Sequence, residues 1–263
     1  MPMDSRLHVS LPYRMLAEQG GFLLARRLQP EIAFKGPDLD EVDLAELLER
    51  WGAAFRAAGL AVAVHAPFMD LNPGAVEPLV REVTALRLNQ ALDAAQRLGA
   101  RRLVVHPGYD RWRYAGNEDL WVEQSLGFWP PLIRRAADAG VVLALENVFE
   151  DAPGNLEKLL AAIDSPWFGH CFDVGHWHLF CRERISLADW FQRFSRHLVH
   201  LHVHDNLGEG DDHLPIGEGL IPFAEFFALV RRHAPQATLT LEAHDPESLL
   251  RALLAVRPFL VPC

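Results

Sequence analysis

Nine side chains that can bind metal ions lie at or just past the ends of short apolar segments in this sequence. They are His65, His106, Glu146, Asp173, His176, His202, Asp211, His213 and Glu242. Imidazoles and carboxylates are common protein ligands for zinc and other divalent cations. Burying them costs several kcal/mol unless they are paired or bound to a metal. The pattern therefore predicts a metal-dependent active site.

Two histidines and two glutamates carry most of this signal. His65 ends Val-Ala-Val-His-Ala-Pro, and His106 ends Val-Val-His-Pro-Gly. A single histidine of this kind is more often a core residue bonded to a backbone carbonyl, but two strands that end this way favour metal binding. Glu146 and Glu242 follow apolar runs, where a buried glutamate needs a cation or a hydrogen-bonding shell. A salt bridge to arginine is the alternative for each.

Further donors cluster in the second half of the chain. Asp173 and His176 are three residues apart across an expected tight turn, so they can reach one metal ion or two adjacent ones. Alternation places His200, His202 and His204 on one face of a strand, and periodicity alone does not choose the ligand among them. Asp211 and His213 precede a loop whose glycines let the backbone fold over a site.

The elements that must position these donors alternate along the chain. Apolar, strand-like runs cover 7–10, 31–34, 61–65, 103–106, 141–146, 170–173, 198–204 and 238–242. Helical patterns follow at 13–27, 40–58, 74–98, 117–139, 153–163, 186–196, 222–233 and 246–256, with Asp40 expected to cap the second. Eight βα units in 263 residues predict an α/β fold, a single (β/α)8 TIM barrel with one domain over 1–263. Such barrels carry catalytic residues at the carboxyl ends of the strands, where the donors fall.

Composition bears on location and partners. Half of the residues are hydrophobic, and no run is long enough to span a membrane. The chain shows no signal-peptide pattern, and Cys171, Cys181 and Cys263 lack zinc-finger spacing, so we expect reduced thiols and a cytoplasmic enzyme. A formal charge of −10 argues against a large nucleic-acid footprint, because such binding depends on neutralising phosphates.

The ordered motifs resemble the xylose isomerase-like TIM barrel superfamily, which includes endonuclease IV and the sugar isomerases and epimerases. The resemblance covers nearly the whole chain. The motifs are His-Pro-Gly at His106, Glu-Asn at Glu146, Asp-x-x-His at Asp173, His-x-x-Asp at His202, Asp-x-His-x-x-Ile-Gly-Glu-Gly from Asp211, and Leu-Glu at Glu242. By this resemblance His202 is the ligand of its strand, and His204 becomes a candidate for contact with the substrate.

The resemblance implies two possible metal arrangements. The endonuclease IV pattern gives three zinc ions: His65 and His106 at the first, Asp173, His202 and Glu242 at the second, and His176, Asp211 and His213 at the third, with Glu146 bridging the first two. The isomerase pattern uses the second site alone, with Glu146, Asp173, His202 and Glu242 around one divalent ion, which can be zinc, manganese or magnesium.

Two functions follow from these arrangements. In the favoured one, the protein is an isomerase or epimerase of a small sugar, sugar phosphate or keto-polyol, and Glu146 and Glu242 move a proton through an enediolate. In the alternative, a zinc cluster hydrolyses a phosphodiester, in abasic DNA or in a small phosphoester. Dehydration or lyase chemistry with the same glutamate pair is a third possibility. The loop from Lys35 to Glu41 holds one lysine and three acids, a poor phosphate clamp, which favours the isomerase.

Further candidates for substrate contact surround the histidine-bearing strands. After His106, the segment 109–114 interleaves Arg111, Trp112 and Arg113 with tyrosines, a composition that could hold a phosphate and cover a sugar face. A solvent-exposed loop packed on the next helix is the alternative. Phe68 stands where the nuclease pattern often has an aromatic hydroxyl, and we include it with His204 among the expected substrate contacts.

Overall fold

Eight parallel strands close into a barrel in the computed structural model, which describes residues 6–260. Each strand pairs with the next along the chain, and β1 also pairs with β8 to close the ring. The strands are β1 (Leu7–Pro12), β2 (Gln29–Ala33), β3 (Ala63–His65), β4 (Arg102–Val105), β5 (Val142–Glu146), β6 (Phe168–Asp173), β7 (Leu198–Val203) and β8 (Thr238–Leu241). The predicted barrel is confirmed.

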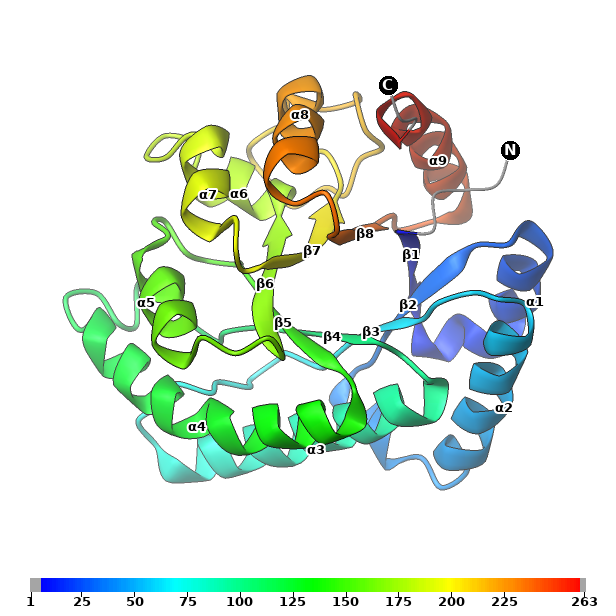
Figure 1. Ribbon diagram of the computed structural model, residues 1–263, viewed down its shortest axis with the longest axis horizontal. Coiled ribbons are helices and arrows are strands. Elements are labelled where there is room, and N and C mark those ends of the chain that lie inside the picture. The colour runs from blue at the N-terminus through cyan, green and yellow to red at the C-terminus, as the bar shows by residue number, and fades with distance from the viewer. Residues whose placement is uncertain (1–5, 261–263) are drawn as a thin grey trace.

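Helices surround the barrel as an outer ring (Figure 1). They are α1 (Leu16–Arg26), α2 (Leu44–Ala57), α3 (Pro78–Leu98), α4 (Glu118–Ala139), α5 (Gly154–Ile163), α6 (Val174–Phe180), α7 (Leu187–Phe194), α8 (Phe223–His233) and α9 (Pro246–Leu260), with short 3-10 helices η1 (Tyr13–Met15) and η2 (Gly36–Asp40). Glycines in the left-handed conformation follow α3 and α4, at Gly99 and Gly140, and end these helices.

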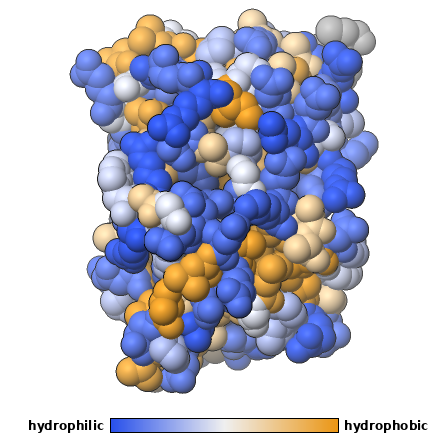
Figure 2. All heavy atoms as spheres, turned by 90° about the vertical axis from the view of Figure 1, so that its left-hand side faces the viewer, coloured by the Kyte–Doolittle hydropathy of each residue, from blue (hydrophilic) through white to orange (hydrophobic). Residues whose placement is uncertain are grey.

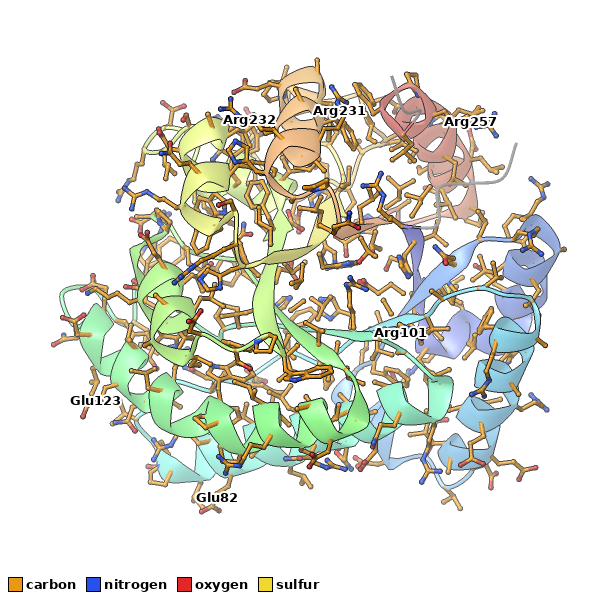
Figure 3. All side chains as sticks on the ribbon, in the orientation of Figure 1. Glu82, Arg101, Glu123, Arg231, Arg232 and Arg257 are labelled. Atoms are coloured by element: carbon orange, nitrogen blue, oxygen red, sulfur yellow. The ribbon has the colours of Figure 1, made fainter. Side chains whose placement is uncertain are left out.

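The helices are amphipathic and bury their apolar faces against the barrel. On α7, Trp190, Phe191 and Phe194 are fully buried, and the hydroxyl of Ser186 caps the helix by accepting from the backbone N–H of Asp189. Labelled charged side chains such as Glu82, Glu123 and Arg257 project outward from the helical ring (Figure 3). The face on the left of Figure 1 is mainly hydrophilic, with hydrophobic side chains gathered in its lower half (Figure 2).

Two local predictions are wrong. Asp40 does not cap the second main helix: it ends η2 and pairs with Arg87, and α2 begins after Asp43. The chain after β6 does not form a simple tight turn but enters α6, because the Asp173 carboxylate accepts from the backbone N–H of His176 and caps that helix at 2.7 Å.

Other expectations from the sequence stand as follows. No helix of residues 6–260 is both long and apolar enough to cross a membrane. Cys171 and Cys181 are free and buried, whereas Cys263 lies outside the described residues. That residues 1–263 form one domain stays a prediction.

Candidate metal centre

The structure brings all nine predicted donors together at the carboxyl ends of the strands. Distances of 3.2–3.8 Å between nitrogen and carboxylate oxygen atoms link every one of the nine to another member of the set. Short strands that all end at the same level of a closed barrel produce this convergence. The donors fall into a central group and two flanking groups.

Glu146 is the hub of the centre. Its Oε2 atom lies 3.2 Å from Nε2 of both His65 and His106, and its Oε1 atom lies 3.3 Å from Nδ1 of His176. The side chain is buried at the end of β5. Oε2 also lies 3.5 Å from Nδ1 of His202, so this one carboxylate faces both the pair His65 and His106 and the central histidine.

The central group surrounds Nδ1 of His202, a buried atom that has no hydrogen-bond partner in the structure. This nitrogen lies 3.5 Å from Glu146 Oε2, 3.5 Å from Glu242 Oε1 and 3.8 Å from Asp173 Oδ2. An imidazole nitrogen without a partner, facing three carboxylates in a buried space, fits a divalent cation.

The first flanking group consists of His65, His106 and Glu146, three donors close enough to share one ion. Nδ1 of His65 donates to the carbonyl oxygen of Ala66 at 2.8 Å, which leaves Nε2 facing Glu146. This fixes the ring in the orientation that metal binding requires.

The second flanking group consists of His176, Asp211 and His213. Oδ2 of Asp211 lies 3.4 Å from Nε2 of His176 and 3.2 Å from Nε2 of His213. Nδ1 of His176 donates to the carbonyl oxygen of Asn147 at 2.9 Å, so its Nε2 is the atom available to an ion.

His204 lies between the central group and this second flanking group. Its Nε2 is 3.2 Å from Asp173 Oδ2, and its ring stacks on His213 with centroids 4.0 Å apart. Glycine at 175 makes room, because a Cβ atom there would lie 2.0 Å from Cε1 of His204. His204 therefore lies among residues that could hold a metal ion, and its expected contact with substrate stays a prediction.

Glu31 is a site residue that sequence reasoning missed. Nε2 of His202 donates to Glu31 Oε1 at 3.0 Å, and Nε2 of His200 donates to Glu31 Oε2 at 2.8 Å. Thr240 donates to the same carboxylate at 2.7 Å. The available signal was a glutamate inside a buried strand segment, Gln-Pro-Glu-Ile-Ala, where a charge needs partners.

Asp205 orders the loop that carries Asp211 and His213. Its two carboxylate oxygens accept from the backbone N–H groups of Asn206, Gly217, Gly219 and Ile221, at 2.9–3.1 Å. Charge-assisted bonds to backbone N–H groups are among the stronger hydrogen bonds in proteins. This buried side chain therefore holds the loop over the centre.

The electrostatics of the centre suit a cation. Burial raises the pKa of Glu146, but the imidazoles of His202 and His106 outweigh that effect and hold the pKa well below its usual value. Burial lowers the pKa of His202, but the interactions with Cys171, Glu242 and Glu31 raise it overall. The negative carboxylates of the centre therefore need positive charge beside them, which protonated imidazoles or a bound cation can supply.

The other expected substrate contacts divide into two pairs. Phe68 and Arg113 line a cavity of about 890 Å³ that also reaches His106. Arg111 and Trp112 do not line it: the Arg111 guanidinium lies over the Trp112 ring at 4.3 Å and is 5.8 Å from the ring centroid of Phe180. Their contact with a substrate stays a prediction.

Comparisons with known proteins agree with this architecture. An uncharacterized protein of Methanocaldococcus jannaschii, MJ1311, is 29% identical over 207 residues, which cover 76% of this chain and 70% of the relative. A probable endonuclease 4 of Mycobacterium leprae is 28% identical over 192 residues, covering 67% of this chain and 71% of that protein.

Solved structures show the same fold over almost the whole chain. The TTHB071 protein of Thermus thermophilus, from a crystal soaked with zinc chloride, is 28% identical, with a TM-score of 0.76 and coverage of 96% of this chain and 98% of the other. A D-tagatose 3-epimerase-like protein is 24% identical, with a TM-score of 0.83 and 97% coverage of each chain, a likeness of fold. The family model of the xylose isomerase-like TIM barrel matches residues 28–258, and this chain belongs to that family.

Proposed function

We propose that this protein is a divalent-metal-dependent isomerase or epimerase of a small sugar, sugar phosphate or keto-polyol. The observation that carries the proposal is the central group, in which Glu146 and Glu242 each approach Nδ1 of His202 to 3.5 Å beside Asp173. Four donors around one point suffice for one ion, and two of the three carboxylates among them, Glu146 and Glu242, are glutamates that can transfer protons.

The two glutamates differ in their surroundings. Glu146 is buried beneath the imidazoles of His65 and His106, whereas Glu242 follows β8 and is partly exposed at the mouth of the barrel. A bound divalent cation would polarise the substrate carbonyl and stabilise the developing negative charge on its oxygen. We assign to Glu242 the removal of the proton from the carbon beside that carbonyl, and to Glu146 the proton transfer on the opposite side.

The charge near the site supports a small, weakly charged substrate. Among the described residues that line the cavity beside His106, Asp70, Glu77 and Asp110 stand against the single cation Arg113. A nucleic acid draws much of its affinity from phosphate neutralisation, and these carboxylates oppose it. Three epimerases among the structural neighbours, named for D-psicose, D-allulose and L-ribulose, share the fold at 13–16% identity.

A second function, hydrolysis of a phosphodiester by a three-ion centre, is favoured by a separate observation. Beyond the central group, His65 and His106 flank Glu146 on one side, and His176, Asp211 and His213 gather on the other. A one-ion isomerase does not need these five donors. The relative named as a probable endonuclease 4 points the same way.

His213→Ala separates the two functions, because it removes a donor of a flanking group and none of the four donors of the central group. The isomerase proposal predicts that turnover of a ketose substrate falls by no more than about threefold, since Glu146 and Glu242 are both retained and Glu242 loses only a contact at 3.8 Å with His213. Loss of one bound ion together with most of the phosphodiesterase activity would instead support the three-ion hydrolase. His244→Ala is the matched control, because the exposed His244 ring stacks on His213 but belongs to none of the three donor groups.

A further inference from the structure

We propose that the cavity beside His106 binds an uncharged, ring-containing apolar group joined to the sugar, so that the substrate is a glycoside that carries a ketone on its sugar ring, or a similar conjugate, rather than a free monosaccharide. This inference rests on the proposed function, which places the sugar at the central group. The cavity would then determine which sugars the enzyme accepts.

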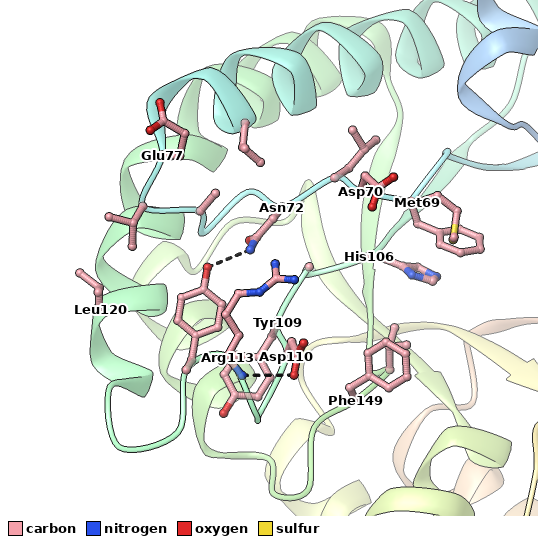
Figure 4. Close-up of a pocket in the computed structure, with 18 of the residues that line it drawn as sticks. Met69, Asp70, Asn72, Glu77, His106, Tyr109, Asp110, Arg113, Leu120 and Phe149 are labelled. Atoms are coloured by element: carbon pink, nitrogen blue, oxygen red, sulfur yellow. Dashed lines mark hydrogen bonds between the residues drawn. The ribbon is translucent and has the colours of Figure 1, made fainter.

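The cavity lies between the loop that follows β3 and the loop that follows β4 (Figure 4). Its volume of about 890 Å³ falls within the range of pockets that take drug-sized ligands. Under the proposed function, the reacting carbons of a sugar would occupy only the metal centre. Space of this size beside the centre therefore fits a substrate with a second part.

Apolar side chains gather around this cavity although water reaches them. Met69 and Val76 are 75% and 58% exposed, and Phe68, Leu120 and Phe149 are also exposed; all five line the cavity. Exposed apolar surface is costly when it is contiguous and often marks a ligand site. Covering it with an apolar group would remove that surface from water.

The walls are held in place without a ligand. Tyr114 accepts a hydrogen bond from Asn72 at 2.8 Å (Figure 4). It also donates to the carbonyl oxygen of Gly74 at 3.1 Å, and the two bonds tie the two loops together. Gly108, at φ 64°, packs against the backbone at Asn72, where a Cβ atom would approach Cα to 2.6 Å. A preformed cavity loses little conformational entropy on binding.

The cavity is continuous with the metal centre through Phe68. The Phe68 ring stacks on His106 at 4.3 Å between centroids and meets His65 edge-on at 5.8 Å. A group attached to a sugar at the central site would pass over Phe68 into the cavity. The surface that it crosses is aromatic rather than charged.

The charges around the cavity argue for an uncharged aromatic occupant. Asp70, Glu77 and Asp110 would repel an anion. Among the described residues, none accepts a hydrogen bond from the Arg113 guanidinium or forms an ion pair with it. A guanidinium without such a partner can lie over the face of an aromatic ring.

The test compares binding of phenyl β-D-glucopyranoside and methyl β-D-glucopyranoside to the metal-loaded protein by isothermal titration calorimetry. The wild type should bind the phenyl glycoside about tenfold more tightly, because burying the phenyl ring in the cavity removes apolar surface from water and so favours binding. Val76→Glu, on the wall, should reduce the preference to about twofold or less. Leu79→Glu is the matched control: Leu79 is 65% exposed, three residues away, and does not line the cavity, so the preference should remain.

The outcomes separate this inference from the proposed function. Equal binding of the two glycosides by the wild type would overturn the inference. An equal loss of the preference for the phenyl glycoside in Val76→Glu and Leu79→Glu would also overturn it. Proton exchange on a free ketose without any preference for the phenyl glycoside would leave the proposed function standing and the inference refuted. A preference for the phenyl glycoside that is lost only in Val76→Glu, without isomerase activity on any ketose or ketone-bearing glycoside, would support the cavity site and refute the function.

Discussion

Glu31 on β2 accepts a hydrogen bond from Nε2 of His202 on β7 at 3.0 Å, and this contact leaves Nδ1 of His202 facing Glu146 and Glu242. A residue outside the donor set thus fixes the tautomer and the orientation of a central donor. Such supporting contacts are as much a part of a metal site as its ligands.

Replacing Glu31 with Ala should weaken binding of the central ion by roughly 10- to 100-fold, because His202 loses the acceptor that holds its ring. Competition with a chromophoric chelator measures this. Thr240→Val is the control, since it removes another hydrogen bond to the same carboxylate without touching His202. Equal metal affinity in wild type and Glu31→Ala would show that Glu31 is merely structural.

Glu242→Gln should lower turnover by about 100-fold or more, because the amide cannot take the substrate proton. The fold should be retained, since Glu242 lies past the end of β8 and at the barrel mouth. Product formation, followed alongside circular dichroism, checks both points. Turnover at the wild-type rate would remove Glu242 from the proposed mechanism.

Removing bound metal should abolish activity, and one equivalent of a divalent ion should restore it. One central ion suffices for the proposed chemistry, so the recovery curve should reach its plateau near one ion per chain. Titration of Mn²⁺ or Zn²⁺ into chelator-treated protein, with metal content read by plasma mass spectrometry, provides the measurement. A plateau reached only near three ions would favour the hydrolase.

Glu150 should make the folded protein less stable as pH rises. Burial raises the pKa of this carboxyl to about 7 from 4.5, so the folded state keeps a proton that the unfolded chain loses between these values. The free energy of unfolding should therefore fall from pH 4.5 to pH 7, by up to roughly 3 kcal/mol, and then level off.

Glu150→Gln tests that account, because glutamine imitates the protonated side chain. The variant should match the wild type near pH 5 and exceed its stability at pH 8 in urea unfolding followed by circular dichroism. Glu183→Gln, at an exposed glutamate, is the control and should change stability little at either pH. A Glu150→Gln variant no more stable than the wild type at pH 8 would refute the account.

The barrel and most of the donor set could be read from the sequence because both depend on local pattern, whereas the choice of His202 among three alternating histidines came from the family resemblance. Strand ends such as Val-Val-His-Pro-Gly at His106 mark where buried chain meets the barrel mouth, and the strand order then brings those ends together. Contacts between distant residues could not be read this way. The bond from Glu31 to His202 spans 171 positions and depends on barrel closure.

Local helix geometry set a different limit on what could be predicted from the sequence. α6 is only seven residues long, and its start at Val174 and Gly175 carries weak helix propensity, so the pattern indicated a turn. The capping bond from Asp173 to the His176 N–H and the space that Gly175 leaves for His204 decide the structure there. Both are tertiary or geometric facts that periodicity does not encode.

The most direct test of the central claim is proton exchange with solvent. Metal-loaded protein is incubated in D₂O with a panel of ketoses and ketose phosphates, and with bis(p-nitrophenyl) phosphate as the hydrolase substrate. The account predicts deuterium, detected by NMR, at a carbon beside the carbonyl of at least one sugar, and no release of p-nitrophenol. Release of p-nitrophenol that disappears in His213→Ala, without deuterium incorporation into any sugar, would contradict it.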